Sequence, residues 1–303
     1  MSEKRYLWEN GSMIPWHKGT THVMNASMHY GVAAFEGIRF YDTPQGPTVF
    51  RMTDHLDRFF YSMKALGMSV TYNHAQLGNA ILQLIKLNDM KEGYIRPIAW
   101  FSDEKIGLHL VGGAVSIQIG LFEWQKSSKD AFRVHFSPLR RIHPQTTNVE
   151  AKISGHYVNT HLALQHAIAN HFDDAILLDY AGYIAEASAA NIFWIKDNVF
   201  FTPPRGTILN GITRQTILRI AKDLGYKTKK TRARRKELLK ADEIFLCGTA
   251  YEIKPVVQIE DTTIGNGTRG ILTTLIKDAY HSAVRGELEQ YFPWLAVVPS
   301  DHF

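Results

Sequence analysis

Lys152 is the side chain in this sequence with the most direct route to covalent chemistry. It stands in NVEAKISGHYVNTHLALQHA, residues 148–167. A lysine held at a fixed place can form a Schiff base with a carbonyl compound. Taken alone, it is more simply interpreted as a solvated lysine, although lysines that are buried do occur in rare cases.

Two further segments could bind an anion. Gly211, Ile212 and Thr213 begin a long helix in LNGITRQTILRIAKDLG, where unpaired backbone N–H groups and a hydroxyl can hold a phosphate. Thr249 follows an apolar strand in CGTAYE, so the amides around it could bind the same anion or a carboxylate. Arg51, at the end of PTVFR, would neutralise that charge. Each of these features alone also fits a capped helix or a surface arginine.

Glu186 is a carboxylate in YIAEASAANIF, a strand that is otherwise apolar or small. Burying such a group is costly unless it meets a cation or a hydrogen-bond donor, and a pyridinium nitrogen would be such a partner. A lysine amine, a phosphate site, an arginine and a buried carboxylate are together the groups needed to hold pyridoxal phosphate. The combination therefore predicts this cofactor.

The elements that position these residues predict an α+β chain of two domains, 1–124 and 131–303. The first domain is expected to contain a hairpin over 5–14 with Asn10 and Gly11 at its turn, a strand over 47–52, helices over 54–67 and 75–88, and strands over 94–101 and 112–124. The polar segment QKSSKD, 125–130, is the predicted linker.

The second domain is expected to begin with a strand over 132–139 and the helix after Lys152. That helix is predicted to bury a broad face, because apolar and aromatic side chains recur at helical spacing; the two sets are Tyr157, His161, Leu164 and Ile168, and Val158, Leu162 and Ala169. Further strands are predicted within 173–179, 183–196, 199–204 and 243–248, with helices over 211–224, 236–241 and 271–284.

Composition narrows the class of protein. The chain has 303 residues, 45% of them hydrophobic and 21% charged, which is typical of a water-soluble globular protein. It shows neither a membrane-spanning apolar run nor a secretory signal, so a cytoplasmic location is expected. Cys247 lies in the apolar run EIFLCG and is expected to be a packed thiol.

The net charge of +5 comes largely from one run, KTKKTRARRKELLK, residues 227–240. A nucleic-acid-binding protein is therefore an alternative, but a single basic run is predicted here to be a solvated loop and the start of a helix. Fourteen histidines do not pair with carboxylates at metal-ligand spacing, and His161 and His166 would face different ways, so no metal is expected.

Nearly the whole chain resembles the fold-type IV pyridoxal-phosphate enzymes, and most of all the branched-chain amino-acid aminotransferases. HYGVAAFEGIRFYD, YIRP, AKISGHY, YIAEASAANIF, LNGITR and CGTAYEIKPV occur in the family's order and spacing, and HLDRFFYSMKALGM resembles the helix after the arginine strand. The resemblance implies a D-amino-acid aminotransferase-like fold, with a small N-terminal α/β sandwich and a larger C-terminal domain with a β-barrel-like core. It also implies ping-pong transfer of the amino group of L-leucine, L-isoleucine or L-valine to 2-oxoglutarate.

The resemblance also implies roles for the cofactor residues. Lys152 would form the internal aldimine and move the proton between Cα and C4′, and Glu186 would keep the ring nitrogen protonated. Tyr157 would hydrogen-bond O3′ of the cofactor. The phosphate would be bound by the segment that starts at Gly211, together with Arg51; the other phosphate residues are Ile212, Thr213 and Thr249.

For the substrate, the resemblance implies that Tyr94 and the amides of Thr249 and Ala250 bind the α-carboxylate, with Arg96 as a polar group near the entrance. An aliphatic side-chain pocket would be formed by Phe35, Gly37 and Trp124, with Tyr30 and Leu108 from a neighbouring subunit. A homodimer or higher homo-oligomer is therefore expected, with no nucleic acid or membrane as a partner.

Three departures from the family's pattern bear on substrate preference. The linker around Ser127 lacks a tyrosine that some relatives carry, and Ala187 and Ala190 stand where many relatives have glycine and glutamate. Tyr251 follows GTA where alanine is common, and a phenol there is expected to narrow or rim the pocket. The alternatives to the L-branched-chain reaction are a relative acting on D-amino acids or (R)-amines, an aminodeoxychorismate lyase, and a non-catalytic scaffold that holds the cofactor.

Overall fold

The computed structural model describes residues 5–124 and 129–299. Backbone contacts divide the chain into two compact units. Unit 1 comprises Met1–Gln125, Ala151–Gly155 and Ser282–Phe303, and unit 2 comprises Lys126–Glu150 and His156–His281. The linker predicted over 125–130 lies mostly outside the described residues, as does Ser127, so the predicted domain boundaries stay a prediction.

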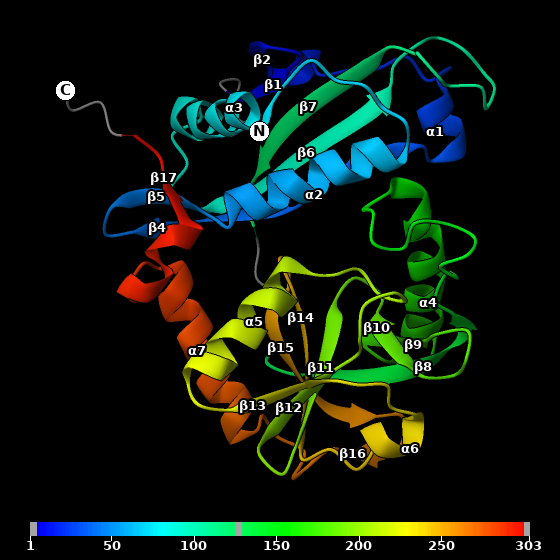
Figure 1. The fold of residues 1–303 in the computed structure, drawn as a ribbon, viewed down its shortest axis with the longest axis vertical. Helices are drawn as coiled ribbons and strands as arrows, with labels where there is room; N and C mark the ends of the chain where they lie inside the picture. Colours follow the sequence, from blue (N-terminus) through cyan, green and yellow to red (C-terminus); the bar gives the residue numbers. More distant parts are fainter. Residues whose placement is uncertain (1–4, 125–128, 300–303) are drawn as a thin grey trace. The chain divides into compact units, whose positions relative to one another are not determined.

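Unit 1 contains an eight-stranded sheet, with β3 (Ala33–Phe35) paired to β6. Its path runs β17 (Leu295–Val297), β5 (Gly46–Phe50), β4 (Ile38–Thr43), β6 (Gly93–Phe101), β7 (Val115–Phe122), β1 (Tyr6–Glu9) and β2 (Ser12–Pro15) (Figure 1). The hairpin of β1 and β2 is confirmed, since Asn10 and Gly11 have φ of 45° and 98°, the positive values that a two-residue turn of this kind needs.

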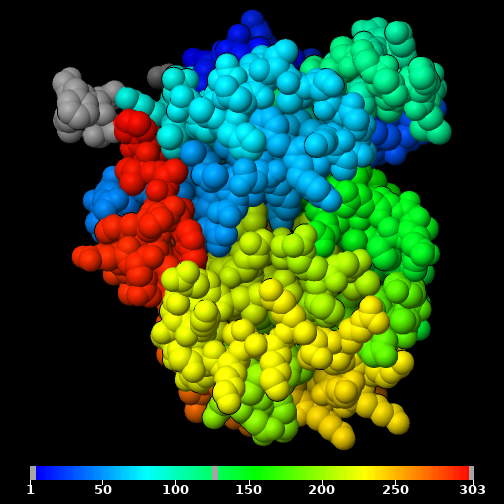
Figure 2. Space-filling model, viewed as in Figure 1, coloured from blue at the N-terminus to red at the C-terminus, as the bar shows by residue number. Residues whose placement is uncertain are grey.

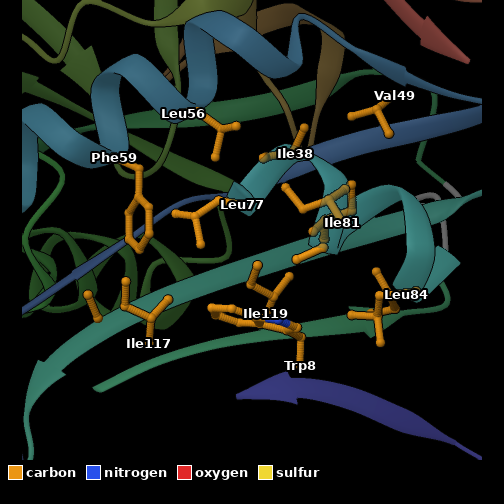
Figure 3. Packing of buried hydrophobic residues seen from close by; sticks show 14 of the residues in the cluster. Trp8, Ile38, Val49, Leu56, Phe59, Leu77, Ile81, Leu84, Ile117 and Ile119 are labelled. Atoms are coloured by element: carbon orange, nitrogen blue, oxygen red, sulfur yellow. The ribbon is translucent and has the colours of Figure 1, made fainter. Parts of the chain in front are cut away.

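Two helices pack on this sheet and form an α/β sandwich. They are α2 (Met52–Ala65) and α3 (His74–Leu87), and both match the predicted ranges closely. Asn73 and Gln76 form a capping box at the start of α3. The core side chains of both helices meet those of the strands; Figure 3 labels Trp8, Ile38, Val49, Leu56, Phe59, Leu77, Ile81, Leu84, Ile117 and Ile119. Each fully buried side chain of this size contributes about 1.5 to 3 kcal/mol.

The remaining elements of unit 1 are short. They are the 3-10 helix η1 (Trp16–Lys18), the helix α1 (Ala26–Tyr30) and the 3-10 helix η3 (Glu289–Trp294). Asn25 caps α1 by accepting a hydrogen bond from the N–H of Met28 at 2.9 Å, and α1 ends at Gly31 in the left-handed conformation.

Unit 2 contains a nine-stranded sheet that curls, with β16 (Thr262–Thr263) paired to β15 (Figure 1). Its path runs β10 (Ile184–Ala187), β9 (Asp174–Leu178), β8 (Phe132–Arg140), β15 (Glu252–Ile259), β14 (Glu243–Gly248), β11 (Asn191–Lys196), β12 (Val199–Thr202) and β13 (Lys227–Lys230). The helices are α4 (Tyr157–Ala169), α5 (Ile212–Asp223), α6 (Arg235–Leu238) and α7 (Ile271–Val284), whose last three residues belong to unit 1. The 3-10 helix η2 (Ser154–His156) begins in unit 1 and ends in unit 2.

The predicted buried face of α4 is wrong. Val158, Leu162 and Ile168 are 63%, 52% and 51% exposed, whereas the buried residues of the helix are Thr160, Ala163 and Ala167. The apolar residues of this helix form two stripes, and the helix packs on β8 and β9 through its small alanines, which allow a close approach. The larger apolar side chains are left on the outer side of the helix.

The basic run also differs from its prediction as a loop. Its first residues, Lys227–Lys230, form strand β13, which pairs in parallel with β12. The short helix α6 follows. The guanidinium of Arg235 lies 4.5 Å from the ring centre of Phe136, so part of the positive charge packs on aromatic side chains. In Figure 2 this part of the chain, coloured yellow, belongs to the surface in view.

Three expectations about chemistry outside the main candidate residues can be compared with the structure. Cys247 is fully buried, burial raises the pKa of its thiol, and the prediction of a packed thiol is confirmed. Across residues 5–124 and 129–299, His, Cys, Asp and Glu side chains form no group of three or more that could hold a metal ion. In the same ranges, every helix is too short or too polar to cross a lipid bilayer.

Candidate active site

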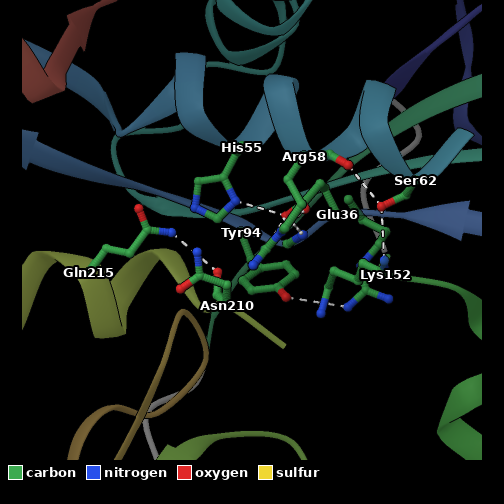
Figure 4. Close-up of polar contacts among 10 residues, drawn as sticks. Glu36, His55, Arg58, Ser62, Tyr94, Lys152, Asn210 and Gln215 are labelled. Atoms are coloured by element: carbon green, nitrogen blue, oxygen red, sulfur yellow. Dashed lines mark hydrogen bonds and ion pairs between the residues drawn. The ribbon is translucent and has the colours of Figure 1, made fainter. Parts of the chain in front are cut away.

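The backbone of Lys152 is held from both sides within unit 1. Its N–H donates to Oγ of Ser62 at 2.8 Å, and its carbonyl accepts from the N–H of Phe35 at 3.1 Å (Figure 4). Two residues beyond Ile153, the N–H of Gly155 donates to the carbonyl of Gly31 at 2.9 Å. A Cβ on Gly31 would lie 2.9 Å from Cα of Gly155, so this close approach requires glycine at position 31. Lys152 therefore has the fixed position that the sequence suggested.

The side chain of Lys152 lies among the residues predicted for the substrate pocket. Its Nζ is 4.8 Å from the ring centre of Phe35, and the guanidinium of Arg96 is 4.9 Å from the same ring. Nη2 of Arg96 donates to the hydroxyl of Tyr94 at 3.4 Å, and the Tyr94 ring stacks on Trp124 with centroids 4.7 Å apart. Two cations and three aromatic rings thus meet in one place.

Gly37 lies against the hydroxyl of Tyr94, where only glycine fits. A Cβ at this position would lie 1.8 Å from the hydroxyl oxygen of Tyr94, so any side chain would displace the phenol. Unit 1 therefore brings six of the predicted residues together: Phe35, Gly37, Tyr94, Arg96, Trp124 and Lys152.

A buried ion network next to this group was missed in the sequence. Glu36, fully buried, accepts from Nε and Nη2 of Arg58 at 2.6 and 2.9 Å, and Nδ1 of His55 lies 2.8 Å from its Oε2 (Figure 4). Burial raises the pKa of Glu36, but Arg58 and His55 outweigh burial and hold that pKa well below its ordinary value. Burial, helped by the charges of Arg58 and Lys152, lowers the pKa of His55 against the opposing charge of Glu36.

The structure places Arg51 in a different setting from Arg58. Nε and Nη2 of Arg51 donate to Asp54 at 2.6 and 2.8 Å, and its guanidinium lies 4.9 Å from the ring centre of Trp294. Arg58 lies one helical turn before Ser62, whose hydroxyl donates to the Arg58 carbonyl at 2.8 Å. Because Ser62 also binds the backbone of Lys152, Arg58 adjoins the lysine. The phosphate role of Arg51 stays a prediction, with Arg58 as a competing residue.

Two residues predicted to reach a neighbouring subunit are exposed on unit 1. Tyr30 is 42% exposed and Leu108 is 74% exposed. Other large apolar side chains near them in the sequence are also exposed, namely Val23, Met24, Met28, Ile106 and Val111. Such a concentration of exposed apolar residues is typical of a protein–protein contact.

Glu186 is buried in unit 2 and well supplied with donors. Its Oε1 accepts from Nε of Arg141 at 2.5 Å, and its Oε2 accepts from Nδ2 of Asn191 at 3.0 Å and from the N–H of Leu209 at 3.1 Å. Glu186 is 6% exposed and so is Arg141, so the ion pair is shielded from water. The expectation that this carboxylate meets a cation or a donor is confirmed.

Asn191 connects Glu186 to the predicted phosphate site. Its Nδ2 also donates to the carbonyl of Leu209 at 2.9 Å. A Cβ on Gly211 would lie 2.0 Å from Oδ1 of Asn191, so only glycine fits at this N-cap. Gly211 supplies no side-chain cap to α5, whose first residues Ile212 and Thr213 are each 4% exposed. The first N–H groups of α5 are therefore available to an anion.

The second predicted anion-binding segment is the turn between β14 and β15, residues 249–251. Gly248 pairs with Glu252 across the base of this turn, and Thr249 and Ala250 are partly exposed.

Tyr157, the first residue of α4, is also partly exposed. Nδ2 of Asn159 in the same helical turn donates to the carbonyl of Arg140 at 2.9 Å. Arg140 directly precedes Arg141, which forms the ion pair with Glu186. The hydrogen bond from Asn159 therefore connects α4 to the residue next to this ion pair.

These residues fit pyridoxal phosphate by their chemistry. The uncapped start of α5 suits a phosphate, and the buried carboxylate of Glu186 suits a protonated ring nitrogen. Nη1 of Arg141 is buried and finds no acceptor in the part of the chain that the structure describes. A bound group that carries an acceptor oxygen would satisfy this N–H donor.

Comparisons with known proteins agree with this chemistry. Residues 33–259 match the model of the family described as amino-transferase class IV. A branched-chain-amino-acid aminotransferase of Pseudomonas aeruginosa is 38% identical over 297 residues, which cover 96% of this chain and 97% of that protein. One from Escherichia coli K12 is 35% identical, with 96% of each chain covered.

A solved structure is similar over nearly the same extent. The branched-chain aminotransferase from the thermophilic archaeon Thermoproteus uzoniensis, in a structure with norvaline, superimposes with a TM-score of 0.94 at 35% identity. The match covers 97% of this chain and 99% of the other. Another branched-chain amino acid aminotransferase, in complex with N-(5'-phosphopyridoxyl)-L-glutamate, gives a TM-score of 0.94 at 36% identity, covering 99% of this chain and 100% of the other.

Proposed function

Because the chain belongs to the class IV aminotransferase family, we propose that it transfers the amino group of branched-chain L-amino acids to 2-oxoglutarate, with pyridoxal phosphate as cofactor. The fold is that of the fold-type IV enzymes, with an α/β sandwich in unit 1 and a curled half-barrel sheet in unit 2. The observation that carries the proposal is the position of Lys152 among Phe35, Tyr94, Arg96 and Trp124.

Pyridoxal phosphate, when bound, supplies an aldehyde that accepts the amino group and a ring that spreads the negative charge arising at the substrate Cα. The chain's residues would do the rest. Lys152 would bind the cofactor covalently and then move the proton at Cα, while Glu186 would hold the proton at the ring nitrogen. Gly211, Ile212, Thr213 and Thr249 would bind the phosphate, and Tyr157 would donate to the ring oxygen.

Substrate selection follows from the composition of the pocket in unit 1. Phe35 and Trp124 offer apolar walls, and such walls discriminate by filled volume at about 1 to 3 kcal/mol per methylene. We assign the α-carboxylate to Tyr94 and to the amides of Thr249 and Ala250. Glutamate also needs a cation for its second carboxylate, and Nε of Arg96, which has no hydrogen-bond partner among the described residues, can provide it.

A homodimer accounts for the exposed apolar residues of unit 1. Tyr30 and Leu108 would then be covered by the second subunit and would complete its substrate pocket. The cytoplasmic location expected from the sequence stays a prediction.

The roles of the two arginines can be separated by a pair of substitutions. We expect Arg58→Gln to weaken cofactor binding by at least about tenfold, because a charge-assisted contact contributes about 1.5 to 3 kcal/mol. Arg51→Gln should change it by less than about twofold, since it is Arg58 that adjoins Lys152 through Ser62, whereas the guanidinium of Arg51 lies against Asp54 and Trp294. Cofactor titration of both apo-proteins measures this. A stronger effect for Arg51→Gln would return the phosphate role to Arg51.

The half-reaction with single amino acids tests the proposed function. L-leucine should convert the cofactor to its aminated form and shift the visible absorbance of the purified protein, whereas D-alanine should leave the spectrum unchanged. Addition of 2-oxoglutarate should then restore the original absorbance spectrum, which would show that the second half-reaction also takes place. A response to D-alanine but not to L-leucine would instead identify a relative that acts on D-amino acids.

A further inference from the structure

Arg214, the last residue of the segment LNGITR, is a buried cation to which none of the roles above is assigned. It is the third residue of α5, and its side chain is among the largest that are fully buried, with 1% of the residue exposed. Burying a charged group is costly unless its donors find acceptors. All three nitrogens of this guanidinium do find acceptors, and all of these lie in unit 2.

The guanidinium of Arg214 joins the two ends of the connection between β12 and α5. At the β12 end, Nη2 donates to the carbonyl of Pro203 at 2.6 Å, and Nε donates to the hydroxyl of Thr202 at 3.1 Å. At the α5 end, Nη1 donates to Oδ1 of Asn210 at 3.1 Å. Thr202 is fixed in turn, because its hydroxyl donates to the carbonyl of Ile192 in β11 at 2.9 Å. Arg214 therefore attaches the start of α5 to the sheet.

Asn210 is the residue through which this attachment reaches the end of the helix, since it directly precedes the N-cap, Gly211. Its backbone carbonyl also accepts from Nε2 of Gln215 at 3.2 Å (Figure 4). The N–H of Gly211 donates to the carbonyl of Leu209 at 2.8 Å, which makes the entry to the helix compact. The direction in which the chain enters α5 is thus set largely by side chains of the helix itself.

The acceptors of Arg214 indicate what the side chain is for. They are a backbone carbonyl, a hydroxyl and an amide oxygen, so every hydrogen bond of this guanidinium to the described residues ends on a neutral oxygen. An arginine presents its donors in a rigid planar fork, which can hold several acceptors in one fixed arrangement. The contacts of Arg214 therefore serve to hold backbone segments together and not to neutralise a carboxylate.

We propose that Arg214 is a positioning residue for the phosphate site: by binding Pro203 and Asn210 it directs the first N–H groups of α5 towards the phosphate of the cofactor. The proposal deepens the function proposed above and rests on it. It predicts a loss of cofactor affinity that depends on the phosphate group, because the start of α5 would bind only that part of the cofactor.

Arg214→Met removes the three donors and leaves a long apolar side chain in the same space. The dissociation constant of pyridoxal 5′-phosphate from the full-length apo-protein should rise by about tenfold or more, because charge-assisted hydrogen bonds are lost. The dissociation constant of pyridoxal, which lacks the phosphate, should change by less than about twofold. A general loosening of the fold would weaken the binding of both compounds. Absorbance titrations with each compound measure the two constants.

Arg214→Lys separates the shape of the guanidinium from its charge. A lysine keeps the positive charge but cannot bind three acceptors through one planar group. If positioning is what matters, the lysine variant should lose nearly as much affinity for pyridoxal 5′-phosphate as the methionine variant. Binding at the wild-type level by Arg214→Lys would show that the charge suffices, and this would contradict the positioning role.

Asn210→Ala tests the same contact from its other end, at a residue that is only partly buried. The dissociation constant of pyridoxal 5′-phosphate should rise by about three- to fivefold, since one hydrogen bond is lost, and that of pyridoxal should not change. Arg219→Gln is the matched control. Arg219 is another arginine of α5, but it forms an exposed ion pair with Asp223 at 2.8 Å, so both constants should stay at their wild-type values.

Unchanged affinity for pyridoxal 5′-phosphate in Arg214→Met would overturn the proposal. If the methionine variant does not fold, unchanged affinity in Asn210→Ala would overturn it. Equal losses for pyridoxal 5′-phosphate and pyridoxal would also overturn it, because the effect would then not pass through the phosphate. A wild-type protein that binds neither compound, or that binds the cofactor without responding to L-leucine, would overturn the proposed function instead.

Discussion

Replacing Lys152 by alanine is expected to abolish transamination, with kcat lowered by about 10⁴-fold or more. The substitution removes both the amine that binds the cofactor and the group that moves the proton at Cα, and general acid–base catalysis alone contributes about 10²- to 10⁴-fold. The protein should still fold, since the backbone of residue 152 makes the contacts with Ser62 and Phe35. The absorbance of the lysine-bound cofactor should be replaced by that of the free aldehyde.

The control for this experiment is Lys196→Ala. Lys196 lies in unit 2 and forms an exposed ion pair with Asp242 at 2.7 Å, and exposed pairs of this kind contribute little to stability because water and salt screen them. This variant should keep the wild-type spectrum and turnover. Steady transamination by Lys152→Ala, under conditions where Lys196→Ala is normal, would show that another residue moves the proton.

The second large effect is expected for Glu186→Gln, in both rate and stability. Loss of the negative charge removes the group that would hold the proton at the ring nitrogen, so kcat should fall by about 10²- to 10³-fold. The same change leaves Arg141 buried without its counter-charge, which costs about 3 to 5 kcal/mol in the free energy of unfolding. Single-turnover spectra and urea unfolding measure the two effects separately.

Glu243→Gln is a matched control for this variant. Glu243 is another carboxylate of unit 2, and it accepts from the N–H groups of Leu272 and Thr273 at the start of α7 at 2.9 and 2.6 Å. Its loss should cost about 1 kcal/mol through the weakened helix cap and leave kcat unchanged. If both variants lose stability but keep kcat, Glu186 is only a structural partner of Arg141.

The elements that were predicted well are those with strong local signals. The helix predicted over 271–284 is observed as α7, and the hairpin of β1 and β2 forms at Asn10 and Gly11. Helical periodicity, caps and turn residues are properties of neighbouring residues, so they are visible in the sequence itself.

The elements that were predicted wrongly depend on partners far away in the chain. Lys227–Lys230 forms a strand because β12 is present to pair with it, and no local property of four basic and polar residues indicates this. The buried side of α4 is likewise decided by β8 and β9, which accept small residues such as Ala163 and Ala167. The periodicity of the larger apolar side chains therefore did not identify the buried side, which belongs to neither of the two predicted stripes.

The same distinction applies to the candidate site. Lys152 and Glu186 stand out in the sequence because each is an unusual residue in its local setting. Glu36 lies in the segment FEG, whereas His55 and Arg58 lie in the segment HLDR. Only the fold shows that these two segments form one ion network. The packing of Tyr251 is equally nonlocal, since its ring contacts Phe132, which lies on another strand.

The lysines of β13 have a consequence for the protein in concentrated solution. β13 is the last strand on the path of the unit 2 sheet, so one of its sides is not covered by a neighbouring strand on that path. Such an edge can recruit a strand from another molecule and start aggregation. Lys227, Lys229 and Lys230 are exposed there, and their like charges would oppose those of a second copy that approached in the same way. The basic run thus protects the sheet from adding strands of a second copy.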